Sequence, residues 1–342
     1  MNTARMVQRW GDRIAHGFAY RIASIGGLVL MLAGSLVQAQ YPTQYPTKPL
    51  KMIVPYAVGG PGDILARQLS PKMAELLGQP IVVDNRPGAG SIAGTEAAAR
   101  AAPDGYTLYL STDGPISINP SLYPKLPYDP VRDFAPVTLL VAARQVLAVN
   151  SSVAATSVTE LIALARAQPG RLNYASFGSG GLSHLAAELF KSMTGTDLTH
   201  IPFKGTAQAL QALIAGEVQV MFVGEPGALP HVKSGRLRAL ASSGPKRTVL
   251  FPDLPTVAEA GVPGYDVQGL FGLLLPAGAP RDVVLRLNAE AAKTLADPEV
   301  LARIRSLGFE PQNGTPEAFA ALIQSEIAKW TKVVRSSGAK PE

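Results

Sequence analysis

Short apolar runs typical of β-strands alternate with helical segments along most of the chain. Residues 50–55 form a strand-like run that ends in a glycine-bearing turn, and residues 63–77 follow with apolar side chains at helical spacing. Gly78 is placed to end that helix, while Pro71 inside it predicts a kink or a break into two shorter helices. Elements of these lengths in alternation predict an α/β protein with parallel-rich sheets covered by helices.

The alternation continues towards the C-terminus, and a local signal marks one further helix start. Ser157 and Glu160 have the spacing of a capping box, which predicts a helix over residues 161–167. The other strands are expected at residues 81–83, 106–110, 172–175, 199–202, 218–222 and 237–241. The other helices are expected at residues 93–101, 185–193, 207–215, 281–296, 298–306 and 315–335.

Two longer apolar stretches interrupt this alternation, at residues 137–149 and 267–275. The first lies in a region with little helical character, between two runs of alternating strands and helices. The second precedes the helices expected at the C-terminus. Two such strands could connect two α/β lobes.

Residues 1–39 have the pattern of a secretory signal peptide. They carry four arginines against one aspartate, then an uncharged apolar run at residues 25–37, then small or slim side chains at Val37 and Ala39. The 13-residue apolar run covers about 20 Å, less than the roughly 30 Å of a bilayer core, so a retained membrane anchor is the weaker interpretation. We expect cleavage after Ala39 and a soluble, exported mature protein.

Charge and composition exclude several function classes. The net charge is +6, of which the first 39 residues contribute +3, so the remaining +3 is too small and too scattered to propose nucleic-acid binding. The absence of cysteine excludes thiolate metal clusters, cysteine nucleophiles and thiol redox chemistry. His184, His200 and His231 lie on different expected elements with no carboxylate at ligand spacing, so no metal site is predicted.

Known catalytic and cofactor-binding motifs are also missing from the sequence. It contains no GxSxG, Walker A or SxxK pattern. Residues 88–93 fit GxGxxA, but residues 84–87 separate these glycines from the preceding strand, and the next acid after the following strand is Asp113. A dinucleotide fingerprint has its glycines directly after the strand, so dinucleotide binding is disfavoured and no cofactor is predicted.

Two glycine-rich turns are better suited to holding a small anion. Residues 56–63 (YAVGGPGD) join the first strand to the first long helix, and residues 176–184 (SFGSGGLSH) join a strand to a helix in the second half. Glycines let backbone N–H groups turn inward, and a helix N-terminus carries roughly half a positive charge, so such a turn can bind a carboxylate without a cationic side chain.

Several side chains in these turns have two interpretations. Asp63 stands where it could cap the following helix, and His184 stands at a helix start, where a structural role is the simpler reading. Ser176 and Ser179 could either shape the turn or contact a ligand.

From about Tyr45 to the C-terminus, the ordered motifs resemble the Bug-type extracytoplasmic solute receptors, the substrate-binding components of tripartite tricarboxylate transporters. The match in the first half is carried by residues 46–56, 59–63, 84–90, 103–106 and 119–130. In the second half it is carried by residues 172–176, 178–180, 183–184, 201–205, 252–256 and 258–261.

This resemblance implies a type II periplasmic-binding-protein fold, with two lobes joined by two crossing strands. It places residues 40–140 and 262–342 in lobe 1 and residues 141–261 in lobe 2, so that the C-terminal helices return to lobe 1. It also implies that the two glycine-rich turns hold a carboxylate between them. The ligand-binding residues carried over by position are Tyr56, Val58, Gly59, Gly60, Asp63, Ser176, Gly178, Ser179, Gly180, His184, Thr206 and Val223.

Two departures from the family pattern bear on the ligand. The first turn has Ala57, Val58 and Gly62 where family members commonly have prolines and a hydroxyl residue, so one side-chain hydroxyl is missing. Val223 stands where the family often has an aspartate, which disfavours an amino-acid ligand unless Glu225 substitutes for that carboxylate. We therefore expect a mono- or dicarboxylate with an apolar or aromatic body.

The resemblance implies a non-catalytic, monomeric receptor in the periplasm. It would close around a small organic carboxylate and deliver it to the membrane permease subunits of a tripartite tricarboxylate-type transporter. One alternative is an exported small-ester hydrolase using Ser179 and His184, which the missing elbow glycines and the lack of an orienting acid disfavour. A receptor that serves a signalling system is a second alternative, which the sequence leaves open.

Overall fold

The computed structural model describes residues 45–341, and all of these except residue 45 belong to one compact unit. The signal peptide predicted for residues 1–39 lies outside the described residues. No helix within the described part of the chain is both long and apolar enough to cross a membrane.

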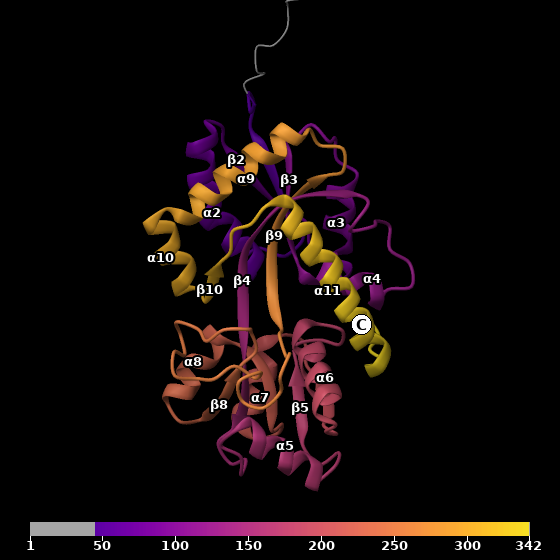
Figure 1. Ribbon diagram of the computed structural model, residues 1–342, viewed down its shortest axis with the longest axis vertical. Coiled ribbons are helices and arrows are strands. Elements are labelled where there is room, and N and C mark those ends of the chain that lie inside the picture. The colour runs from indigo at the N-terminus through magenta and orange to yellow at the C-terminus, as the bar shows by residue number, and fades with distance from the viewer. Residues whose placement is uncertain (1–44, 342) are drawn as a thin grey trace, which may run out of the picture. The chain divides into compact units, whose positions relative to one another are not determined.

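Eight strands form one hydrogen-bonded path in the order β2-β1-β3-β9-β4-β7-β5-β6, and two further strands, β8 and β10, each pair with β4. The strands on the first side of this path are β1 (Leu50–Val54), β2 (Ile81–Asn85), β3 (Thr107–Thr112), β9 (Gln268–Pro276) and β10 (Phe309–Pro311). The strands on the other side are β5 (Asn173–Ser176), β6 (Thr199–Pro202), β7 (Val220–Gly224) and β8 (Leu237–Ser242). Strand β4 (Phe134–Asn150) belongs to both sides (Figure 1).

The two groups of strands have the same internal arrangement. Strand β1 pairs in parallel with β2 and β3, and β5 pairs in parallel with β6 and β7. Strands β4 and β9 run antiparallel to their neighbours. The predicted α/β class with parallel-rich sheets is therefore confirmed, and each parallel group directs the carboxyl ends of its strands to one edge.

The long apolar stretch predicted at residues 137–149 forms most of β4, which passes from one sheet into the other. Up to Arg144 this strand pairs with β9, and from Gln145 onward it pairs with β7 and β8. Val267, directly before β9, is bonded to Ser243, directly after β8, so the chain crosses back at that point. Two crossing strands between two lobes are thus confirmed, while the lobe boundaries given above stay a prediction.

Every helix expected from the sequence is present, and residues 119–122 and 225–233 form additional helices. The helices between strands are α2 (Pro61–Leu77), η1 (Ala89–Ser91), α3 (Ile92–Ala99), η2 (Gly114–Ile118), α4 (Asn119–Leu122), α5 (Val158–Ala167), α6 (Leu182–Thr194), α7 (Thr206–Ala215) and α8 (Glu225–Lys233). The C-terminal helices are α9 (Arg281–Ala296), α10 (Pro298–Ser306) and α11 (Pro316–Ser337). Helix α11 packs against β4, η2 and α4, and also against α6 of the second group.

Helix α2 continues through Pro71 as a single helix, so the break into two shorter helices, one of the two outcomes expected there, does not occur. Leu65 and Leu69 before the proline, and Met73 after it, are all fully buried on one face. This continuous apolar contact offsets the hydrogen bond that the proline removes. Gly78 ends the helix in the left-handed conformation, as predicted, with its N–H bonded to the carbonyl of Glu75.

Candidate functional site

A cavity of about 650 Å³ lies where the carboxyl ends of both parallel groups meet. On the first side its lining follows β1, β2 and β3, through Tyr56, Pro61, Gly62, Gly90, Ser91, Thr112, Asp113 and Gly114. On the second side its lining follows β5, β6 and β7, through Phe177, Gly178, Ser179, Gly180, Gly181, Leu182, Thr206, Gly224, Pro226 and Gly227. Three strand-to-helix connections from each group thus face one another, the usual position of ligand sites in α/β proteins.

The crossing strands complete the lining with Ala143, Arg144 and Gln145 of β4 and with Gly269 and Phe271 of β9. The charged side chains of the lining are Asp113 and Arg144. The guanidinium of Arg144 donates through Nη1 to the carbonyl of Arg247 at 3.2 Å and lies 3.9 Å from Glu310. The guanidinium at the crossing is therefore held through Nη1 by two groups from other segments of the chain.

The first glycine-rich turn is organised around Asp63, which is almost fully buried. Its carboxylate accepts hydrogen bonds from the N–H of Gly59 at 2.9 Å and from Nε of Arg67 at 2.8 Å. Burial alone would raise the pKa of Asp63, but these hydrogen bonds hold that pKa below its usual range. Asp63 therefore closes the turn onto itself through Gly59, while the N-cap of α2 is Gly60, with no hydrogen bond from a capping side chain.

The part of the first turn that lines the cavity is Tyr56 together with Pro61 and Gly62. Val58, Gly59 and Gly60 are outside the lining, and the Val58 side chain is 71% exposed. The hydroxyl of Tyr56 is hydrogen-bonded to that of Thr112. Burial, and then the nearby Asp113, raise the pKa of Tyr56 to about 12, so its hydroxyl stays protonated and can donate.

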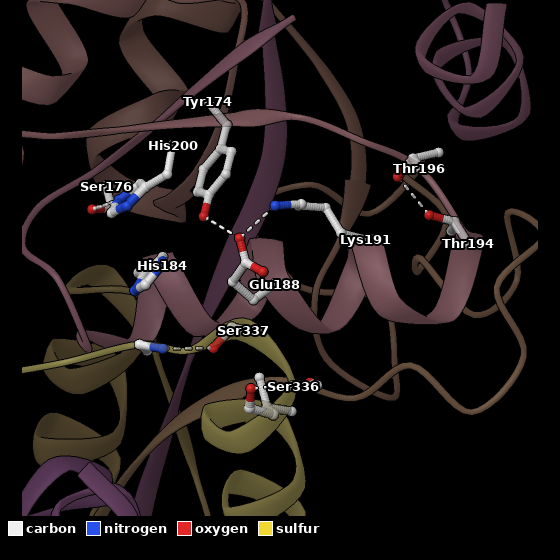
Figure 2. Close-up of polar contacts among 12 residues, drawn as sticks. Tyr174, Ser176, His184, Glu188, Lys191, Thr194, Thr196, His200, Ser336 and Ser337 are labelled. Carbon is white, nitrogen blue, oxygen red and sulfur yellow. Dashed lines mark hydrogen bonds and ion pairs between the residues drawn. The ribbon is translucent and has the colours of Figure 1, made fainter. Parts of the chain in front are cut away.

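In the second turn, the main chain lines the cavity and two predicted side chains lie behind it. Gly178, Ser179 and Gly180 are in the lining, whereas Ser176 and His184 are buried outside it. The N–H of Gly180 donates to Nδ1 of His184 at 3.0 Å, and the Ser176 hydroxyl is 2.7 Å from Nε2 of a third residue, His200. Figure 2 shows these side chains beside the helix that carries His184.

Two further predicted residues have different environments. Thr206, the first residue of α7, lines the cavity. Val223 is completely buried beneath it, and its neighbour Gly224 provides the lining at that point. Glu225, considered above as a partner for a ligand ammonium, is buried outside the lining and accepts a hydrogen bond from Ser242 at 3.1 Å.

Sequence reasoning missed the polar residues that follow β2 and β3 and those at the crossing of β4. They are Ser91, Thr112, Asp113, Asn119, Tyr123, Arg144 and Gln145. The residues after β2 and β3 could have been predicted from their positions in the sequence. The expected strands at residues 81–83 and 106–110 are parallel to the first strand, so they end at the same edge of the sheet. Arg144 and Gln145 lie inside one long apolar stretch and had no comparable local signal.

A second hollow, of about 700 Å³, lies between α2 and α10. Lys72 and Asp297, which form an ion pair at 3.4 Å, contribute to its charged rim. It includes none of the twelve residues predicted to bind ligand. Among the described residues, no group of three or more His, Cys, Asp or Glu side chains is arranged to hold a metal ion.

Asp113 gives a prediction about the pH dependence of stability. Burial, and then the negative charge of Glu326, raise its pKa to about 7. The stabilising contribution of the neutral form is complete below the ordinary pKa of an aspartate and is lost as the pH rises through 7. We expect Asp113→Asn to increase the free energy of unfolding by on the order of 2 kcal/mol at pH 8 and to leave it nearly unchanged at pH 4. Urea unfolding of both proteins at the two pH values measures this; equal differences at both pH values would contradict it.

Two α/β groups joined by crossing strands, with a cavity between their strand ends, define a two-lobed substrate-binding protein of the periplasmic-binding-protein class. The family is shown by the sequence itself. The model of the tripartite tricarboxylate transporter family receptor matches residues 65–339, and the chain belongs to this family.

Relatives of this chain match almost its whole length. Protein BugT of Bordetella pertussis is 36% identical over 321 residues, which cover 94% of this chain and 98% of that protein. A UPF0065 protein of Pseudomonas sp. strain P51 is 37% identical over 311 residues, or 91% of this chain and 92% of that protein. The resemblance inferred from the motifs is therefore confirmed.

Solved structures agree with this assignment. Rpa4515 of R. palustris, solved with adipate, is 36% identical with a TM-score of 0.74, over 87% of this chain and 100% of that one. MatC of Rhodopseudomonas palustris, solved with bound malate, is 34% identical with a TM-score of 0.70, over 85% and 100% of the two chains. The periplasmic binding protein BugD is 34% identical with a TM-score of 0.71, over 87% and 100%. The family consists of receptors, in agreement with the absence of catalytic motifs.

Proposed function

We propose that this protein is a monomeric periplasmic receptor that binds a small organic carboxylate between its lobes and delivers it to the permease subunits of a tripartite tricarboxylate-type transporter. The observation that carries the proposal is the cavity, because strand-to-helix connections of both parallel groups line it. Solved relatives with adipate and malate support carboxylates as the ligand class.

The start of α2 and the start of α6 supply the anion-binding groups. Pro61 and Gly62 open one helix, Gly181 and Leu182 open the other, and all four line the cavity. Helix N-termini present unpaired N–H groups and a partial positive charge, which favour a carboxylate. Capture by main-chain groups requires little cationic charge in the lining, and Arg144 alone provides it.

The rest of the lining suits an apolar ligand body. Its large apolar side chains come from both lobes and from the crossing strands, and are Ile118, Leu122, Phe177, Leu182, Phe271, Leu307 and Phe309. Contacts with both sides would favour the closed arrangement, so that closure is a population shift driven by the ligand. A carboxylate with a hydrocarbon chain or ring would match both the helix N-termini and the apolar side chains of the lining.

A panel of organic acids tests this function. We expect one or more mono- or dicarboxylates, with adipate and malate included, to raise the melting temperature, while the corresponding amides and methyl esters do not. At a concentration one hundred times the dissociation constant, stabilisation of about 2.7 kcal/mol is expected. Differential scanning fluorimetry followed by isothermal titration calorimetry measures both quantities. Absence of stabilisation by every acid of a broad panel would refute carboxylate binding.

A further inference from the structure

The part of the second turn at residues 177–181 is held by two histidines that lie on its side away from the cavity. His184 of α6 accepts the Gly180 N–H through Nδ1 at 3.0 Å. His200 of β6 lies 2.7 Å from the Ser176 hydroxyl through Nε2, and that hydroxyl is 3.2 Å from the carbonyl of Gly178. Gly180 of the cavity lining is therefore held directly by one imidazole ring, and Gly178 is held by the other through the Ser176 hydroxyl. Both rings are themselves outside the lining.

The two imidazoles form a stack with a tyrosine. The ring centroids of His184 and His200 are 4.0 Å apart with an interplanar angle of 9°, and those of His200 and Tyr174 are 4.9 Å apart at 20°. The hydroxyl of Tyr174 donates to Glu188 at 2.6 Å, and Nζ of Lys191 donates to the same carboxylate oxygen at 2.8 Å. In Figure 2, His184, Glu188 and Lys191 project from one helix beside Tyr174 and His200.

The hydrogen bond from Gly180 defines the protonation state of His184. A ring nitrogen that accepts a hydrogen bond carries no proton, so the single proton of His184 is on Nε2. Protonation of the ring would place a second hydrogen on Nδ1, directed at the Gly180 N–H. Two donors cannot share this contact, so the turn would have to move away from the histidine.

The stack also opposes a charge on either ring. Burial first, and then the Lys191 charge, lower the pKa of His184, while Glu188 acts in the opposite sense. Burial and the adjacent His184 lower the pKa of His200 to about 4. The charged groups that act on the pair are thus Glu188 and Lys191, which pair with each other. At neutral pH both rings are uncharged.

We propose that His184 and His200 are positioning residues for ligand binding, which as a neutral stacked pair hold the second turn in its binding conformation, and that the turn is released when His184 is protonated. This inference rests on the proposed function, because the turn is one of the two that would hold the carboxylate. It implies that the affinity of the receptor falls as the medium becomes acidic. It also means that His184 contributes through the main chain of Gly180 without touching the ligand.

A first experiment is independent of any ligand. Nitrogen chemical shifts of ¹⁵N-labelled protein report which ring nitrogen carries the proton, with His184→Asn and His200→Gln used to assign the signals. We expect the His184 proton on Nε2 at pH 7 and a titration below the usual histidine range. A proton on Nδ1, or an ordinary titration of both rings, would overturn the inference even if carboxylates bind.

A second experiment compares affinities for adipate, or for malate if the panel shows that malate binds more tightly, at pH 8, 7, 6 and 5. Asparagine at position 184 retains an acceptor near the place of Nδ1 but does not titrate. At pH 8 we expect His184→Ala to weaken binding about tenfold or more and His184→Asn to restore most of that loss. From pH 8 to pH 5 the wild-type protein should lose about tenfold in affinity relative to His184→Asn.

Comparison at the same pH cancels the ionisation of the acid and of Asp113, which both proteins share. His231 of α8, which is outside the cavity lining, provides the matched control. His231→Asn should follow the wild-type pH profile. A constant ratio between wild type and His184→Asn at all four pH values would remove the positioning role while leaving carboxylate binding in place. A panel without any binder would instead refute the proposed function.

Discussion

Gly180→Ala is expected to weaken carboxylate binding about 100-fold. Gly180 has a φ of +74°, and a Cβ atom there would lie 2.4 Å from Cδ2 and 3.0 Å from Cδ1 of Leu122. Leu122 ends α4 on the first side of the cavity, whereas Gly180 belongs to the second. Because Leu122 is 8% exposed, its methyl groups have little free space, and the clash is most easily relieved by separating the two sides.

The backbone conformation alone does not account for so large a loss. A non-glycine residue in the left-handed region costs roughly 1–2 kcal/mol, chiefly in stability. Gly195, which ends α6, has a φ of +61° and nothing within 4 Å of its Cβ position, so Gly195→Ala is the matched control. Both variants should be destabilised by similar amounts.

Isothermal titration calorimetry with the tightest acid of the panel separates the two effects. A 100-fold loss corresponds to about 2.7 kcal/mol of binding free energy and is expected for Gly180→Ala alone. The N–H that donates to His184 remains in that variant, so its pH profile should keep the wild-type form. Equal affinities of the two alanine variants would show that close approach of Gly180 to Leu122 is not needed for binding.

The close approach of Gly180 to Leu122 is an example of a feature that sequence patterns cannot predict. Apolar spacing and glycine positions are local, so the alternation of strands and helices, the crossing strands and the C-terminal helices could be predicted. That Gly180 would meet Leu122, or Gly59 would bond to the carboxylate of Asp63, depends on how distant segments pack and on how a turn closes on itself. Neither leaves a local pattern in the sequence.

The unexpected elements have a similar explanation. Helix α8 was not predicted because it contains Pro226 and Pro230, and proline is rare inside helices. Pro226, however, lies in the first turn of the helix, where proline is tolerated. Strand β10 is only three residues long and exists through its pairing with residues 141–143 of β4. The unbroken course of α2 through Pro71 likewise depends on packing partners that no sequence window contains.

The candidate site was also predictable only where a local sequence pattern marks it. The two glycine-rich turns were recognisable because strand-to-helix turns need glycine at positive φ, as at Gly59 and Gly180. Which residues of each turn face the cavity was not predictable, since Ser176 and Ser179 are the same residue type, yet Ser176 is buried outside the lining and Ser179 is part of it. The anion-binding chemistry of the turns could be inferred from their residue types, but the directions of their side chains are known only from the folded structure.

Gly272→Ala is expected to destabilise the protein by about 3 kcal/mol without a direct effect on the cavity. Gly272 lies in the middle of β9, paired with Ser111 of β3 and Leu139 of β4. A Cβ there would lie 2.0 Å from Cζ and 2.6 Å from Cε1 of Phe319 on α11. Phe319 is 2% exposed and sits in a closely packed core, so overpacking forces either the ring or the helix to move.

A double-mutant cycle identifies the ring as the cause. Phe319→Leu alone should destabilise by about 1–2 kcal/mol through loss of packing, but in combination with Gly272→Ala it opens space for the new methyl group. The double variant should therefore be more stable than the sum of the two losses predicts, by about 2 kcal/mol. Gly269→Ala is the control, because its Cβ would meet Leu182 and Ala143 at ordinary distances of 3.5–3.6 Å. Urea unfolding of the four proteins measures the cycle. If the losses simply add, or if Gly269→Ala is as destabilising as Gly272→Ala, the packing of α11 on β9 is looser than the structure indicates.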